Sequence, residues 1–149
     1  MAVLVLVGCS LVPGGNEGGE GPAKNVDERG LRTDEEPLTR RFPGLGVPVS
    51  ARWQSGTLGD DRLVPGPSTF WIDAVVELEP RVADRLRSAA SPTGVGQPEL
   101  TPDVAGEAPD GQPEAVAGLG HGSGVADGWT VEAWLVEGTD TVLLSAIGE

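Results

Sequence analysis

The sequence offers few side chains suited to nucleophilic or acid–base catalysis. Its only histidine, His121, lies two residues before Ser123 in the segment GLGHGSG (118–124). A histidine beside a serine is the pairing that activates a hydroxyl for attack on a carbonyl. That chemistry needs a third group to orient the imidazole and a packed surround, and a glycine-spaced segment supplies neither. We therefore interpret this segment as a flexible loop and expect no catalytic residue.

The acidic residues do not form a metal-binding or glycosidase pattern. One His and one Cys cannot build a tetrahedral zinc site. The scattered carboxylates lack the close spacing of a calcium loop. Asp73 and Glu77 would lie about 13 Å apart on one strand face, which exceeds the separation of paired glycosidase carboxylates. The sequence therefore predicts neither a metal nor another cofactor.

Two tryptophans fall on the polar faces of predicted strands. Trp71 shares its face with Asp73, Trp134 shares its face with Glu132, and Arg52 is expected on the same side. Exposed rings beside charged groups suit sugar stacking or a protein interface, so these five residues form a candidate binding face. The alternative is that neighbouring Gly/Pro-rich loops cover the rings as a second small core. The rarity of large exposed rings favours this alternative.

The single cysteine, Cys9, ends the apolar run MAVLVLVGC. Residues LVGC (6–9) resemble the lipobox of bacterial lipoproteins, in which the thiol receives a diacylglycerol and a peptidase cuts just before it. The resemblance implies a lipid anchor on Cys9 and a place at the outer face of the cell membrane. The run is too short to span a bilayer, which needs about 20 apolar residues. The alternative is a buried strand over residues 3–7 of a cytosolic protein.

The segment before the anchor departs from a complete signal peptide. No basic residue precedes Lys24, although such peptides normally begin with Lys or Arg. We therefore expect residues 1–9 to be a truncated lipoprotein signal peptide whose coding sequence starts upstream. Residues 10–36 are rich in Gly and charged residues, and this composition predicts a flexible acidic tether.

A second resemblance covers about the first 90 residues. The stretch WQSGT (53–57) and the run VPGPSTFWIDAVV (64–76) are similar to a family of small lipoproteins from high-GC Gram-positive bacteria. That family has no established activity. The resemblance therefore supports an envelope location and implies no catalytic residue.

Charge excludes two classes of partner. The formal net charge is −13, with nine Arg and one Lys, and no basic patch exists to displace counterions from phosphates. Nucleic acid is therefore not an expected partner. The same acidity disfavours electrostatic adsorption to an anionic membrane, so membrane association is expected through the lipid alone.

Several short elements must position the candidate residues. Period-two alternation predicts strands, and Pro80 at a first helical position favours a helix. The predicted strands cover residues 47–54, 69–79, 129–137 and 141–147, with a helical turn at 38–43 and a helix at 80–90. The first two strands are expected to pair antiparallel, and the last two to form a hairpin. Residues 91–127 read as a long Gly/Pro-rich loop with a short helix near 113–119.

These elements predict an α+β fold in one domain over residues 37–149. We expect a small antiparallel sheet of about four strands with one helix packed on one face, plus long disordered segments. The leading functional hypothesis is a non-catalytic, lipid-anchored binding module of the envelope. Its ligand would be an envelope protein or a cell-wall glycan. The alternatives are a small envelope hydrolase and a passive surface protein without a specific ligand.

Overall fold

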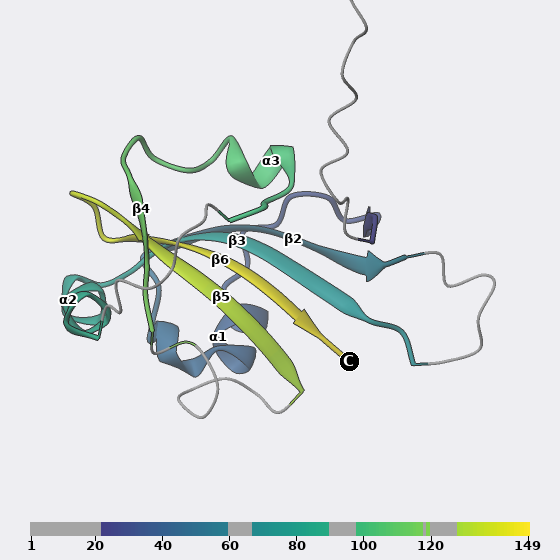
Figure 1. The fold of residues 1–149 in the computed structure, drawn as a ribbon, viewed down its shortest axis with the longest axis horizontal. Helices are drawn as coiled ribbons and strands as arrows, with labels where there is room; N and C mark the ends of the chain where they lie inside the picture. The colour runs from purple at the N-terminus through teal and green to yellow at the C-terminus, as the bar shows by residue number, and fades with distance from the viewer. Residues whose placement is uncertain (1–21, 60–66, 90–97, 118, 120–127) are drawn as a thin grey trace, which may run out of the picture.

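The computed structural model describes residues 22–59, 67–89, 98–117, 119 and 128–149. Over these residues the chain forms a six-stranded antiparallel sheet with helices on both sides (Figure 1). Its elements are β1 (Lys24–Val26), α1 (Glu36–Arg41), the 3-10 turn η1 (Pro43–Leu45), β2 (Ser50–Leu58), β3 (Phe70–Glu77), α2 (Pro80–Ser88), α3 (Pro102–Ala105), β4 (Pro113–Ala115), β5 (Trp129–Val136) and β6 (Thr141–Gly148). The predicted α+β class is confirmed, but the sheet has six strands where about four were expected.

Strands β2 and β3 form one side of the sheet centre. They pair antiparallel from Ser50 opposite Glu77 to Thr57 opposite Phe70, as predicted. β2 extends past the predicted end at residue 54, because β1 and β3 supply hydrogen-bonding partners on both sides of its last residues. Val47 and Val49 were expected on the buried face, but they precede β2 and are 71% and 56% exposed.

Strands β5 and β6 form the predicted C-terminal hairpin, closed by a turn in which Gly138 has φ 74°. The hairpin does not simply extend the sheet in chain order. β6 pairs with both β3 and β5, which gives the order β1-β2-β3-β6-β5-β4. At one end of the sheet this register places Phe70, Gly148 and Trp129 side by side across three strands.

Helices α1 and α2 and the turn η1 cover one face of the sheet (Figure 1). The main core lies between them and the inward side chains of the four longer strands. In α2, Pro80 occupies the first turn, and Val82, Ala83 and Leu86 are buried at helical spacing. The predicted helix is therefore confirmed. The predicted turn at residues 38–43 is a short helix, α1, which begins two residues earlier.

Helix α3 lies on the opposite face (Figure 1). Val104 of α3 is fully buried in a second, smaller core with Trp134, Val136 and Leu143. The expectation of one helix on one face is therefore wrong. Residues 113–115, expected within a short helix, form β4 and pair with β5 instead. The cause is tertiary, because this segment covers apolar side chains that the sheet would otherwise expose.

Strand β1 lies within the segment expected to be a flexible tether. Residues 24–26 pair with β2, and Arg32 forms an isolated bridge with Trp53. Order therefore begins before residue 37. Cys9, His121 and Ser123 lie outside the described residues, as does the predicted signal peptide. No helix in the described part of the chain is long and apolar enough to cross a membrane.

Candidate functional site

The five residues of the predicted binding face do not form an exposed surface. Trp71 and Asp73 are 0% exposed and Trp134 is 7% exposed. Arg52 is half-buried and lies 3.7 Å from a carboxylate of Glu107, whereas Glu132 is exposed. The candidate binding face with exposed rings is therefore not formed, and the favoured alternative, that both tryptophan rings are covered, agrees with their burial. Of the two alternatives, the covering loop is the one observed over Trp134, because the segment around α3 packs on its indole.

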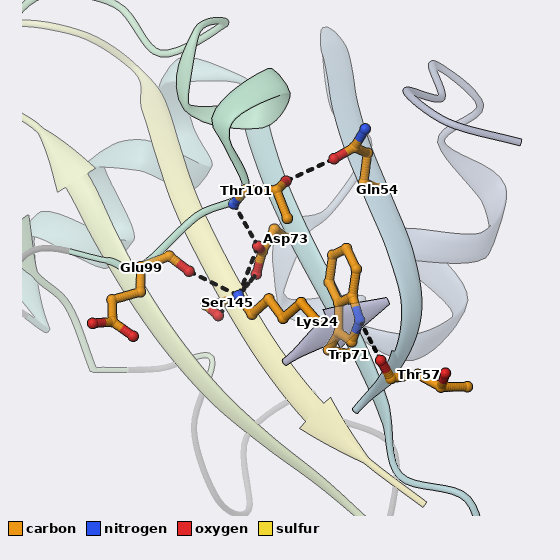
Figure 2. Close-up of polar contacts among 8 residues, drawn as sticks. All are labelled: Lys24, Gln54, Thr57, Trp71, Asp73, Glu99, Thr101 and Ser145. Carbon is orange, nitrogen blue, oxygen red and sulfur yellow. Dashed lines mark hydrogen bonds and ion pairs between the residues drawn. The ribbon is translucent and has the colours of Figure 1, made fainter. Parts of the chain in front are cut away.

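Asp73 is the centre of a buried polar network (Figure 2). Lys24 donates two hydrogen bonds from Nζ, to Oδ1 of Asp73 at 2.8 Å and to Oδ2 at 2.7 Å. The Thr101 amide donates to Oδ2 at 2.8 Å, and the Ser145 hydroxyl donates to Oδ1 at 3.0 Å. The third donated bond of Lys24 goes to the carbonyl oxygen of Glu99 at 2.8 Å. Three elements therefore converge on one carboxylate.

This arrangement leaves neither charged group available for chemistry. A carboxylate offers about four lone-pair sites, and Asp73 accepts four hydrogen bonds. An ammonium has three protons, and Lys24 donates three bonds. The Glu99 carboxylate points away from the pair (Figure 2), so Glu99 joins the network only through its backbone oxygen. We interpret the pair as a structural clamp that holds β1 and the segment before α3 against the sheet.

A second set of hydrogen bonds extends the clamp to α3. The Thr101 hydroxyl donates to Oε1 of the buried Gln54 side chain at 2.7 Å. Gln54 then donates from Nε2 to Oδ2 of Asp103, in the first turn of α3, at 2.9 Å. Both ends of the buried amide are therefore satisfied, as a buried polar group requires. The network lies beside a shallow hollow of about 470 Å³, and its polar side chains are engaged with one another.

An open site lies on the other face, at the end of the sheet beside α1. It is a cleft of about 870 Å³. Its walls come from the segment after β1, from α1 and from the ends of β2, β3 and β5. The lining residues are Asp27, Glu28, Arg29, Arg32, Glu36, Pro37, Arg40, Arg41, Trp53, Ser55, Gly56, Thr57, Phe70, Trp71, Ile72, Trp129 and Glu149.

Two aromatic rings form a shelf at the edge of this cleft. Phe70 and Trp129 flank Gly148 in register, and Phe70 is 45% exposed. A Cβ on Gly148 would lie 2.4–2.8 Å from three atoms of the Trp129 indole, so the ring lies flat on the backbone here. Phe42 meets the same indole edge-on at 5.9 Å between centroids. Glycine at position 148 therefore allows the Trp129 indole to pack closely on β6, and the ring is partly exposed.

Arg32 lines the cleft and is held in place by its neighbours. Its guanidinium carbon lies 3.9 Å from the ring centroid of Trp53, a stacked cation–π contact. The same guanidinium donates to both carboxylate oxygens of Asp34, at 3.0 and 2.6 Å. This hydrogen-bonded guanidinium lowers the pKa of Asp34 below its ordinary value of 3.8. Arg32 is thus held by a ring and a carboxylate, and it serves as scaffold.

The other three arginines of the cleft are less constrained. Arg40 pairs with Glu36 on the exposed side of α1. Arg41 donates to the carbonyl oxygen of Pro37 at 3.1 Å, and its guanidinium carbon lies 5.8 Å from the Trp129 centroid. Within the described part of the chain, neither Arg29 nor Arg41 forms an ion pair. The cleft therefore offers cations beside an aromatic shelf.

Sequence reasoning missed this cleft for identifiable reasons. Arg29 and Arg32 lie in the segment interpreted as a tether, and Arg40 and Arg41 lie in a turn of no recognised function. Trp129 was assigned to the apolar face of its strand, which is correct, but its position at the end of that face was not considered. One signal was available, because four of the nine arginines fall within residues 29–41 of a strongly acidic chain.

No group of three or more potential metal-ligating side chains occurs among the residues that the structure places. The Asp140 carboxylate accepts a hydrogen bond from Arg87 at 2.8 Å. Comparisons of the chain with protein-family models, with curated proteins and with solved structures find no match.

Proposed function

We propose that this protein is a non-catalytic binding module, held at the outer face of the cell membrane by lipid on Cys9, whose ligand occupies the cleft beside α1. The observation that carries the proposal is the cleft itself. It gathers four of nine arginines and two partly exposed rings at one end of the sheet. Its volume lies in the usual range for small-ligand sites, roughly 300–1,000 Å³.

The groups in the cleft suit holding a ligand better than transforming one. Arginine stays protonated at any working pH, so it binds anions but does not exchange protons. Among the carboxylates, Asp27 already accepts hydrogen bonds from the Ser55 hydroxyl and the Arg29 amide. Glu36 is paired with Arg40. These contacts describe a recognition surface of fixed donors and rings.

The proposal is tested with the full chain, labelled with ¹⁵N and titrated with material from the envelope of a high-GC Gram-positive host. Carbohydrate, protein and lipid fractions of one preparation are added separately. We expect one fraction to shift the indole resonance of Trp129 and the amide of Arg41. The Arg41→Gln variant should weaken that response, whereas Arg81→Gln, an exposed change on α2, should not. If no fraction shifts cleft resonances, the binding function is wrong.

A further inference from the structure

We propose that the cleft takes an acidic glycan, a short carbohydrate that carries a single carboxylate. This inference rests on the proposed function and names the class of ligand for the same site. Four features of the described residues support it. The first is the aromatic shelf, and the second is the pair of arginines without carboxylate partners. The third is that acidic residues are as many as arginines in the lining. The fourth is that the backbone at the edge of β2 is already hydrogen-bonded within the chain.

The aromatic shelf suits the face of a sugar ring. Aromatic rings carry negative charge on their faces, and the C–H bonds on one side of a pyranose present weak positive charge. Trp129 packs on Gly148 and is partly exposed, and Phe70 is 45% exposed beside it. The two adjacent rings offer an apolar surface on which a flat, weakly polar ligand can stack. Of the four aromatic residues of the lining, Trp53 and Trp71 are buried, so Phe70 and Trp129 are the two rings that a ligand can reach.

The cations define the acidic group. Arg32 is committed to Asp34 and Arg40 to Glu36. Arg29 and Arg41 have no such ion pair within the described residues. A guanidinium binds a carboxylate through two parallel hydrogen bonds, a geometry that a planar carboxylate matches. The cleft is therefore equipped for one carboxylate close to the aromatic shelf.

The acidic residues exclude a polyanion and favour hydroxyl groups. The lining contains four arginines and four acidic residues, namely Asp27, Glu28, Glu36 and Glu149. A polyphosphate or nucleic acid needs an excess of cations, and the cleft has no such excess because its arginines and acidic residues are equal in number. Carboxylates accept hydrogen bonds from hydroxyls, which sugars supply in quantity. A ligand with many hydroxyls and one carboxylate satisfies both sets of groups.

A peptide that adds a strand is not favoured at this site. Such recognition needs an exposed strand edge. The edge of β2 beside the cleft is already occupied, since Arg32 and Trp53 exchange backbone hydrogen bonds of 2.7 and 3.0 Å. The Asp27 amide also donates to the Ser55 carbonyl oxygen at 2.9 Å. Backbone groups that would pair with a peptide here are satisfied within the chain.

The test compares two defined disaccharides that differ in their carboxylate. N-acetylglucosaminyl-N-acetylmuramic acid carries one, and di-N-acetylchitobiose carries none. We expect the full chain to bind the acidic disaccharide about tenfold more tightly, the effect of a hydrogen-bonded charge. Affinity is measured by calorimetry and by the Trp129 indole resonance. Arg29→Gln and Arg41→Gln should each reduce this preference, and Arg81→Gln should leave it unchanged.

The shelf is tested separately with Phe70→Leu, which keeps an apolar side chain but removes the flat ring. Both disaccharides should then bind more weakly by a similar factor, and the preference for the acidic one should persist. Ile147→Leu, at a 44% exposed apolar position on the other sheet face, is the matched control.

Three results would overturn the inference. They are equal binding of the two disaccharides, binding of neither, and stronger binding of inorganic phosphate or of an acidic peptide. The proposed function would survive any of them if another envelope fraction still shifted the cleft resonances. Both ideas fail together only if no fraction does so.

Discussion

The ion pair of Lys24 and Asp73 joins the N-terminal strand to the centre of the sheet. The Asp73 carboxylate is completely buried, and the Lys24 side chain is 23% exposed. Desolvation of a buried carboxylate is costly, and here its charge is offset by the chain's only lysine together with two further donors. Lys24 also lies 5.3 Å from the Trp71 ring centroid, so the same side chain helps to cover that indole.

Removing the cation alone should therefore destabilise the fold. In Lys24→Met, Asp73 would keep its two neutral donors but lose its counter-charge. We expect the free energy of unfolding to fall by about 3 kcal/mol, the lower part of the range for a broken buried pair. Urea titration followed by tryptophan fluorescence measures this loss. Arg81→Met, at an exposed position on α2, is the control, and equal stability of the two variants would contradict the clamp interpretation.

At the scale of elements, β1 depends on a glycine in its partner strand. A Cβ on Gly56 would lie 1.7 Å from the carbonyl oxygen of Asn25 and 3.1 Å from the Trp71 ring. A side chain at position 56 would therefore force the backbone of β1 to move away from β2. The absence of a side chain at position 56 is therefore what lets a three-residue strand lie close enough for Lys24 to reach Asp73.

Gly56→Ala should displace β1 and with it the ammonium of Lys24. We expect a loss of unfolding free energy at least as large as that of Lys24→Met, about 3 kcal/mol. In the double variant the two losses should not add, because the alanine has already removed the contact. Urea titration of the single and double variants measures the coupling.

Gly106→Ala is the matched control for that experiment. Its Cβ would meet only carbonyl oxygens at 3.4 Å or more, which is close to ordinary contact. Fully additive losses in the Gly56 and Lys24 variants would mean that β1 does not act through this ion pair.

At the scale of the whole molecule, the sheet separates two tasks between its faces. The face under α3 holds the buried polar network and the smaller core. The face under α1 and α2 holds the main core and, at its open end, the arginine-lined cleft. A stable sheet with one end of one face open is a suitable support for a binding site, since rigid elements fix the lining residues.

The lipid anchor is a prediction about the whole chain. Expressed behind a complete signal peptide that ends in LVGC (6–9), the protein should incorporate a fatty-acid label and sediment with membranes. Cys9→Ser should lose the label, because no other thiol exists in the sequence. Ser10→Ala should keep it. Labelling of the Cys9→Ser variant, or none in the unaltered chain, would contradict lipidation at this residue.

Much of the fold follows from local patterns in the sequence. The β-branched and aromatic run from Phe70 to Glu77 defines β3, and the two predicted strands around Gly138 define the C-terminal hairpin. Pro80 with apolar residues at helical spacing defines α2. Each of these signals lies within one element, where side-chain period directly reflects which face is buried.

Tertiary structure alone decided the rest. β1 and β4 have three residues each, too few to show a period, and they exist because longer strands offer them an edge. Whether Trp71 and Trp134 are exposed depended on segments far away in the chain that cover them. The cleft likewise joins Arg29 and Arg41 to Trp129. Such contacts depend on the placement of β6 between β3 and β5, and no local pattern encodes that placement, since strand order is fixed by the burial of whole faces.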